Sequence, residues 1–366
     1  MLSINIERFL SQTLKPLLTP KIAGLFVLGL GAGLPLLMIF SSLSLWLKQA
    51  GVSKSEITFF SWAALGYGFK YIWAPLIDRV PFPVLGRMLG QRRGWMLVSQ
   101  CAVMLAMIGM ASIDPQYNLL WMALFAVMLG FSSATQDIVI DAYRIECADP
   151  KLQGLLAASY IAGYRLAMII SGAGLLWLVS AQQTNAEIYE YGAWKLGYLS
   201  MAAVMLLPMV AVFFIKEPAP SLENNSGDSF PNRDYMRFVL SFVVAAGVLI
   251  LVFRYFGRID FGDPSRYMTL AIEFVRLTIA LIAGGLMFAW FILLNIAPKQ
   301  LFSKGYVMPV KEFFSRYSLV NALLILCAIG LYRAPDIIMG TSANIFYDDL
   351  GFTLDQIATI SKTFGL

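Results

Sequence analysis

The segment Leu119–Glu146 reads LLWMALFAVMLGFSSATQDIVIDAYRIE, and its two halves differ sharply in polarity. The first half, LLWMALFAVMLGF, has no charged residue and consists mostly of Leu, Met, Phe and Ala. A long apolar run of this kind predicts a helix that crosses a membrane. Within about three further helical turns the segment adds Gln136, Asp137, Asp141, Arg144 and Glu146. Whether these side chains meet water depends on the rest of the chain.

The overall composition is that of a membrane protein. Hydrophobic residues make up 59% of the 366 residues and charged residues 13%, and the mean hydropathy is +0.71. About a quarter of the residues of an ordinary soluble domain are charged. Because long apolar stretches recur along the sequence, we predict an all-α polytopic membrane protein.

The residue types exclude several kinds of site. The chain has no histidine, so proton chemistry falls to carboxylates. Its three cysteines lack the spacing of a disulfide framework or a zinc site. No phosphate-binding loop, zinc signature or nucleophile elbow occurs, and the net charge of +5 comes without a basic run. We therefore expect no enzyme, no metal, no cofactor and no nucleic-acid partner.

Apolar runs long enough to cross about 30 Å of hydrocarbon recur along the whole chain. They lie at 22–47, 57–77, 95–113, 119–142, 157–180, 196–215, 236–256, 275–297 and 318–346, and a further one begins near Asp355. Lys and Arg gather in one set of the alternating loops, which predicts that this set and the N-terminus are cytoplasmic. Residues 1–21 have the pattern of an amphipathic helix rather than of a cleavable signal.

The order of these spans predicts a transporter of the major facilitator type. Six spans within 22–217 form a complete N-terminal half, and a polar linker, 218–234, follows them. Residues 235–297 add an extra transmembrane hairpin, and 298–317 form a cytoplasmic loop. Residues 318–366 begin a C-terminal bundle that is incomplete in this chain.

The loop after the second span predicts a cytoplasmic gate. Asp78 and Arg79 open it, and Arg92 with Arg93 close it, as in the loop motif of major facilitators. The alternative is plain positive-inside topology, which gives no reason for Asp78. Asp141, Arg144 and Glu146, at the cytoplasmic end of the fourth span, are expected near this loop. We predict that Asp141 and Glu146 pair with its cations.

Three charged residues, Lys70, Asp137 and Arg165, fall inside predicted spans. Each would cost roughly 3 kcal/mol if it faced lipid, so we expect all three to face a shared interior. Two cations against one anion suit an anionic ligand, and the alternative is a purely structural buried pair. Asp137 lies deeper than Asp141 in the fourth span and is the first candidate for a proton carrier.

Several other polar and aromatic residues are candidates for substrate binding. Gln136 lies beside Asp137 in the chain, and Tyr67 and Tyr164 flank the charged positions. Arg333 and Asp336, three residues apart in the seventh major-facilitator span, either pair with each other or line the opposite wall of a central cavity.

Six motifs together resemble one family, the muropeptide permeases of the AmpG family. They are YGFKYIWAPLIDR, RRGW, SSATQDIVIDAYRIE, GYRLAMIISG, FFIKEP and SKTFGL. The resemblance implies a monomeric carrier of the Gram-negative inner membrane that imports N-acetylglucosaminyl-1,6-anhydro-N-acetylmuramyl peptides, driven by protons. Such import serves peptidoglycan recycling and signals β-lactamase induction.

Two other functions stay open. The acetyl-CoA transporter family has a similar pattern in its fourth span, so a carrier of acetyl-CoA or another organic anion is one alternative. A membrane sensor that transports nothing is the other.

Overall fold

The computed structural model describes residues 19–60, 67–68, 70–79, 82, 85–147, 150–184, 189–218, 231–259, 262 and 266–359. Throughout these ranges the regular elements are helices, as predicted. The chain forms two compact units, the first made of Met1–Ser221 with Ala328–Leu366 and the second of Leu222–Cys327.

Seven helices of the described residues are long and apolar enough to cross a membrane. They are Pro20–Gln49, Gln91–Ala111, Leu119–Glu146, Gln153–Gln182, Tyr191–Phe214, Met236–Phe256 and Ala271–Leu293. Each overlaps a predicted span, with ends that differ by a few residues. The prediction of a polytopic all-helical membrane protein is therefore confirmed.

The predicted span 57–77 is not one helix in the described residues. It appears as α4 (Lys54–Phe60), a single 3-10 turn η3 (Lys70–Ile72) and α6 (Ala74–Arg79). Pro75 explains why α6 begins where it does, because proline lacks an N–H donor and is accepted in the first turn of a helix.

Two spans of the first unit are interrupted by π-helical turns. The first span runs as α2 (Pro20–Leu37), η1 (Met38–Ser42) and α3 (Leu43–Gln49). The fifth runs as α10 (Gln153–Ile169), η5 (Ile170–Gly174) and α11 (Leu175–Gln182). The two π-turns touch, since the Ser42 hydroxyl donates to the Ser171 carbonyl at 3.2 Å. Such turns bend a span locally and often mark functional positions.

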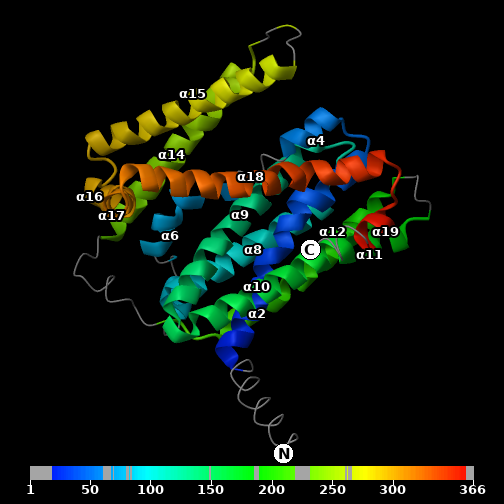
Figure 1. Ribbon diagram of the computed structural model, residues 1–366, viewed down its shortest axis with the longest axis horizontal. Helices are drawn as coiled ribbons and strands as arrows, with labels where there is room; N and C mark the ends of the chain where they lie inside the picture. The colour runs from blue at the N-terminus through cyan, green and yellow to red at the C-terminus, as the bar shows by residue number, and fades with distance from the viewer. Residues whose placement is uncertain are drawn as a thin grey trace, which may run out of the picture. The chain divides into compact units, whose positions relative to one another are not determined.

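Glycines let α2 and α10 pack backbone against backbone, as Figure 1 shows for these neighbouring helices. A Cβ on Gly163 would lie 2.0 Å from the Phe26 carbonyl oxygen, and one on Gly29 would lie 2.2 Å from the Tyr160 carbonyl oxygen. Neither position has room for a methyl group. Small residues allow close approach of this kind in membrane helices.

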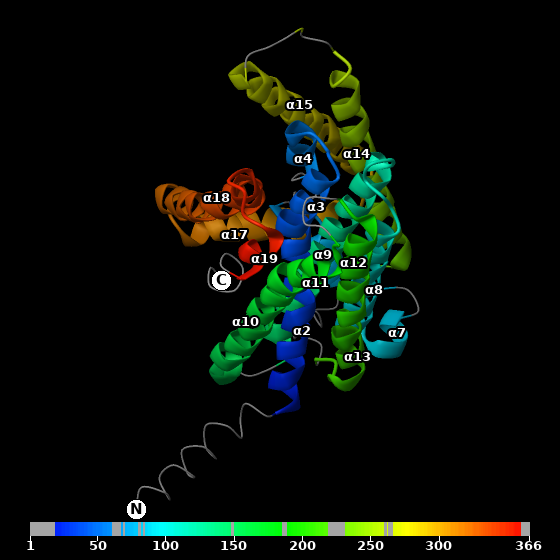
Figure 2. The same cartoon turned by 90° about the vertical axis from the view of Figure 1, so that its right-hand side faces the viewer.

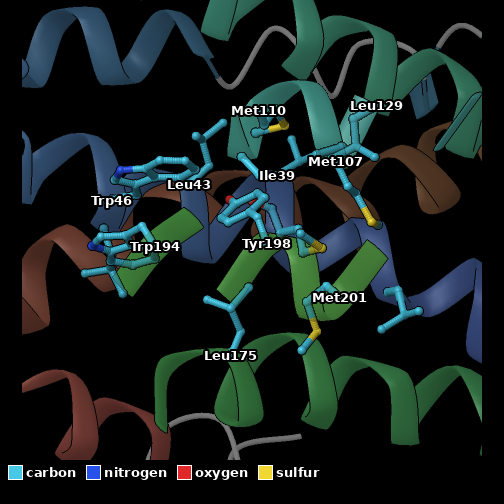
Figure 3. Packing of buried hydrophobic residues seen from close by; sticks show 14 of the residues in the cluster. Ile39, Leu43, Trp46, Met107, Met110, Leu129, Leu175, Trp194, Tyr198 and Met201 are labelled. Carbon is cyan, nitrogen blue, oxygen red and sulfur yellow. The ribbon is translucent and has the colours of Figure 1, made fainter. Parts of the chain in front are cut away.

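An aromatic and methionine cluster fills the core at one end of the first unit (Figure 3). Trp46 of α3 stacks on Trp194 of α12 (Tyr191–Val204), with ring centroids 5.7 Å apart. Tyr198 donates its hydroxyl to the Met38 carbonyl at 3.1 Å, next to the π-turn. The Trp194 indole N–H donates to Gln49 at 2.8 Å. We call this the Trp46 end.

The remaining spans of the first unit are α8 (Gln91–Ala111) and α9 (Leu119–Glu146), which pack on each other, and α12 with α13 (Leu206–Phe214). Figure 2 shows that α3 continues the direction of α2, and that α13 continues the direction of α12. Since α8 starts and α9 finishes at the end away from Trp46, the bundle has two distinct ends. We call the other one the Arg92 end.

The second unit is built on a hairpin of α14 (Asn232–Phe256) and α15 (Arg266–Leu293). Arg276 of α15 donates its Nε hydrogen to the Phe253 carbonyl at 2.7 Å and pairs with Glu273 at 2.9 Å. Residues 298–317, predicted as a loop, are mostly helical. They hold α16 (Lys299–Phe302), η6 (Ser303–Val307) and α17 (Met308–Arg316).

The chain then continues as α18 (Leu319–Asp349) and α19 (Leu354–Gln356). Thr353 starts α19 with a capping box that it forms with Gln356. The last predicted span therefore begins close to Asp355, and its residues from 360 onward lie outside the described part.

The glycine contact between α2 and α10 gives a direct test of this packing. We expect Gly163→Ala to lower the thermal unfolding temperature, because the added methyl group meets a backbone oxygen that cannot move alone; overpacking of this kind costs about 1–3 kcal/mol. Gly154→Ala, on the same helix and with nothing within 4 Å of its Cβ, is the matched control. Equal unfolding temperatures for both variants in detergent would contradict the close packing.

Candidate functional site

Arg92 is the centre of an ion-pair cluster at the Arg92 end of the first unit. The residue is 6% exposed, at the start of α8. Its guanidinium pairs with Asp78 of α6 at 2.7 Å and holds both oxygens of Glu146 of α9, at 2.5 and 2.9 Å. A two-pronged contact of this kind is strong and geometrically specific. Arg92 thus ties three helices together.

Glu217 completes the cluster from the end of the sixth span. Its carboxylate accepts hydrogen bonds from the backbone N–H groups of Arg92 at 2.7 Å and Arg93 at 3.1 Å. A carboxylate is stabilised at a helix N-terminus by the free N–H groups and the helix dipole. Gly90, with φ 98°, is required there, since a Cβ would lie 2.3 Å from the Glu217 carboxyl carbon.

Arg93 binds the C-terminal end of α13, the helix that leads to Glu217. Its Nε hydrogen is donated to the Val212 carbonyl at 2.8 Å, and Nη2 donates to the Phe213 carbonyl at 3.3 Å. These carbonyls end α13, where an orphan acceptor attracts a cation. The sequence pointed to Arg92 and Arg93 but missed Glu217, although it lies in the FFIKEP motif.

Asp141 does not join this cluster, contrary to the prediction. It pairs with Arg144 on its own helix, at 3.3 Å. The reason is rotation, because residues 141 and 146 lie about 140° apart around an α-helix. Glu146 faces Arg92 while Asp141 faces elsewhere, and Arg144 lies 5.9 Å from the centre of the Tyr160 ring. The side chain of Arg79 lies outside the described part.

Lys70 and Asp137 form an ion pair inside the first unit. Lys70 Nζ lies 3.8 Å from Asp137 Oδ2, and the two side chains are 36% and 11% exposed. The other carboxylate oxygen, Oδ1, is buried and has no hydrogen-bond partner among the described residues. The pair is therefore half-satisfied, with one carboxylate oxygen facing no donor.

Neighbouring hydrogen bonds hold the Lys70 segment on α9. Tyr67 donates its hydroxyl to Ser133 at 2.6 Å, and the Trp73 indole N–H donates to Thr135 at 3.1 Å. Both acceptors lie within four residues of Asp137 in the chain. Tyr67 is thus a positioning residue in this structure, and Ser133 and Thr135 were not singled out from the sequence.

Gln136 does not share a cavity with Asp137, contrary to the prediction. It is fully buried, and its Nε2 atom is 2.8 Å from the position of a Cβ on Gly31, with Pro208 close to the same glycine. Consecutive helical residues point about 100° apart, so Gln136 faces α2 and α13 while Asp137 faces Lys70. Neither amide atom of Gln136 has a partner among the described residues, and the same holds for the buried Gln100 of α8.

Arg165 does not meet Lys70 and Asp137 among the described residues, so its place in a shared interior stays a prediction. It is exposed on α10 and makes no ion pair with another described residue. Tyr164 beside it is half-buried, with its ring centre 6.1 Å from that of Tyr160. The side chains of Arg333 and Asp336 lie outside the described part. Only two of the three intramembrane charges thus meet.

A second ion cluster lies at the Trp46 end and was not predicted. Lys48, at the end of α3, pairs with Asp348 and with Asp349, the latter at 2.7 Å. Lys54 also pairs with Asp349, at 2.7 Å. The Lys48 and Lys54 hydrogen bonds hold the pKa of Asp349 below its usual value. The cluster joins the first span to the far end of α18.

The described residues contain no group of three His, Cys, Asp or Glu side chains that could hold a metal ion. The first unit thus holds one cation and one carboxylate, Lys70 and Asp137, among apolar helices. A separate ion cluster lies at each of its two ends. A pair of opposite charges can exchange one partner for an anionic ligand and can gain or lose a proton.

Comparison with known sequences places this chain among transporters. The family described as acetyl-coenzyme A transporter 1 matches residues 21–237. The anhydromuropeptide permease of Escherichia coli K12 is 35% identical over 97% of this chain and 54% of that protein. Putative transporter AmpG 4 of Rickettsia felis is 28% identical over 93% of this chain and 63% of that protein. The predicted resemblance to the AmpG family is confirmed.

The chain spans between about half and two thirds of the length of these relatives. Among solved structures, the crystal structure of a D-xylose-proton symporter aligns with 94% of this chain and 81% of its own, at 14% identity and a TM-score of 0.40. A similarity of that size carries no argument about the fold.

A substitution at Arg92 tests how much this ion-pair cluster contributes to the stability of the fold. We expect Arg92→Gln to lower the free energy of unfolding by about 1–3 kcal/mol, because it removes the charge-assisted hydrogen bonds that the buried guanidinium makes to two helices. Arg87→Gln, an exposed cation of the same loop, is the control. If both variants unfold at the wild-type temperature, the charges of this loop only set the orientation of the chain in the membrane.

The Trp46-end cluster predicts a pH dependence. A carboxylate whose pKa is lower in the folded protein stabilises the fold above its ordinary pKa and loses that effect as the pH falls through the lowered value. We expect wild type to unfold at a higher temperature than Asp349→Asn at neutral pH. The difference should vanish below the pKa of Asp349. A difference that is constant from neutral to acid pH would contradict the ion pairs.

Proposed function

We propose that this chain, which belongs to the family described as acetyl-coenzyme A transporter 1, forms part of a proton-coupled carrier that imports anhydromuropeptides across the inner membrane. Its 35% identity to the anhydromuropeptide permease of Escherichia coli K12 supports this substrate. The substrates are N-acetylglucosaminyl-1,6-anhydro-N-acetylmuramyl peptides, whose uptake serves peptidoglycan recycling and β-lactamase induction. The Lys70–Asp137 pair is the observation that carries the proposal.

The pair explains how an anionic substrate and a proton are moved together. A carboxylate of the stem peptide competes with Asp137 for Lys70. Asp137 then stands without a cation in apolar surroundings, where a carboxylate is costly and the protonated form is favoured. Substrate binding therefore draws in a proton. Release of the substrate returns Lys70 to Asp137, and the proton leaves.

The two ion clusters act as the gates of this carrier. In the orientation that we propose, the N-terminus is cytoplasmic, so the Arg92 end faces the cytoplasm and the Trp46 end faces the periplasm. At the periplasmic end Lys48 links the first span to α18, and Lys54 links α4 to α18. Asp78, Arg79, Arg92, Arg93 and Glu146 belong to the cytoplasmic gate, with Asp141 and Arg144 beside it.

The remaining candidates keep supporting roles. Arg165 and Tyr164 of α10, with Arg333 and Asp336 of α18, are proposed to complete the substrate site in the whole carrier, which acts as a monomer. Tyr67 supports the site through Ser133.

An acetyl-CoA carrier is the second candidate, since the matching family is described by that substrate. Adenine-nucleotide phosphates would also bind Lys70. The two candidates are separated by competition, because excess acetyl-CoA inhibits uptake of labelled anhydromuropeptide only if both compounds use the same site.

Uptake by cells that lack their own muropeptide permease tests the proposal. We expect the whole carrier to accumulate labelled anhydromuropeptide, and an uncoupler to abolish the accumulation. Asp137→Asn should still exchange substrate but not accumulate it, because its side chain cannot bind and release the proton. Asp141→Asn, on the same helix, should slow uptake without changing the final accumulation.

Two results would contradict the proposal. One is the absence of uptake by a well-expressed whole carrier. The other is proton-driven accumulation by Asp137→Asn that equals wild type, which would remove Asp137 from the coupling step while leaving transport itself intact.

A further inference from the structure

The helical segment between the hairpin and α18 has two features that the transport proposal does not use, an apolar face and a set of cations. The segment consists of α16, η6 and α17, residues 299–316, in the second unit. One end of it is fixed, since Leu301 is 4% exposed and the Tyr306 ring stacks on Phe238 with centroids 6.0 Å apart. The Phe302 ring lies 5.7 Å from Phe288 of α15.

The sequence of α17 divides the helix into two faces. Val310, Phe313, Phe314 and Tyr317 are spaced i, i+3, i+4, i+7 and form one apolar stripe. Lys311, Glu312, Ser315 and Arg316 occupy the other side. On a helical projection Lys311 and Arg316 lie on opposite edges of the stripe, each about 110° from its centre.

The apolar stripe is only partly covered by protein. Phe313 and Phe314 are half-buried, whereas Val310 is 57% exposed and Tyr317 is 39% exposed. Val307, one turn before Val310, is 44% exposed. An amphipathic helix with an open apolar side and basic edges suits a membrane surface, where the apolar side enters the acyl boundary and long cationic side chains reach the headgroups.

The direction of α17 fits a position in the membrane plane. The helix from Val310 to Arg316 and the apolar helix from Leu319 to Tyr332 meet at an angle of 113°. Tyr317 makes this bend with extended backbone angles, φ −114° and ψ 142°. If the second helix crosses the bilayer, α17 cannot continue it and runs closer to the surface.

The charge of the segment selects the kind of membrane. Between residues 298 and 317 the cations are Lys299, Lys304, Lys311 and Arg316, and the single acidic residue is Glu312. Glu312 pairs with Arg316 at 3.0 Å, an exposed contact. The surplus is positive, and basic residues near an interface are attracted to anionic lipid.

We propose that the helical segment 299–316 lies in the membrane interface and binds anionic phospholipid headgroups, with the Val310 stripe in the acyl boundary. The lipid surface is the occupant of the exposed stripe. The segment thereby holds the start of α18 at a fixed depth in the bilayer.

The test uses the whole carrier, with its native cysteines replaced by serine, in nanodiscs of phosphatidylcholine with or without phosphatidylglycerol. A fluorophore is attached at Val310→Cys, on the apolar stripe, or at Ser315→Cys, on the polar side as the matched control. Brominated acyl chains quench a fluorophore that lies beside them. We expect strong quenching at position 310 and weak quenching at position 315.

Brominating one lipid at a time reports which headgroup is enriched. Each cation near an anionic surface strengthens association about fivefold, so brominated phosphatidylglycerol should quench position 310 several-fold more than brominated phosphatidylcholine at equal mole fraction. The variant Lys299→Gln/Lys311→Gln, and separately high salt, should remove that preference. The elution profile of each variant in size-exclusion chromatography shows that the carrier is still folded.

Two outcomes would overturn the proposal. Absence of quenching at position 310 would mean that protein covers the stripe, another part of the carrier or a second copy. Quenching by both lipids alike would mean that the segment meets the membrane without binding anionic headgroups.

Discussion

A partly exposed lysine and a buried carboxylate are tolerated among apolar helices only while they compensate each other, and this constraint organises the first unit. Lys70 and Asp137 are 3.8 Å apart, and the second carboxylate oxygen has no described donor. The two charges therefore form an ion pair, but one carboxylate oxygen of Asp137 still lacks a described hydrogen-bond donor. A structural ion pair usually saturates its remaining acceptors. An incomplete pair can instead exchange a partner, which is what coupling of an anion to a proton requires.

The ion clusters at the two ends of the bundle differ in construction. Arg92 is buried and holds helices of the same half together, with Glu217 capping the helix start. Lys48 and Lys54 instead reach Asp348 and Asp349, some 300 residues away in the chain, through partly exposed contacts. Exposed pairs are weak and easily screened. This asymmetry suits a rigid cytoplasmic end and a periplasmic contact that can open, on the orientation that we propose. The touching π-turns at Ser42 and Ser171 lie on the spans that lead to the second contact.

The sequence predicted the helices well because apolar length alone decides which segments can span a membrane. It also grouped Lys70 with Asp137, and the two side chains form an ion pair. It did not predict rotation. Gln136 and Asp137 share a level but face different helices, and Asp141 turns away from the Arg92 cluster that Glu146 enters. Rotation is set by packing, here by Gly31 and Pro208. The Lys48–Asp349 contact was invisible for a similar reason, because nothing local to either residue specifies a partner so distant in the chain.

The central claim is that substrate takes Lys70 from Asp137 and leaves that carboxylate protonated. Infrared difference spectroscopy of the reconstituted carrier measures this step directly, because a protonated carboxyl group has its own carbonyl band. We expect addition of anhydromuropeptide to produce such a band in wild type and not in Asp137→Asn. A carrier that binds the substrate without the band, or a band that persists in Asp137→Asn, would contradict the account.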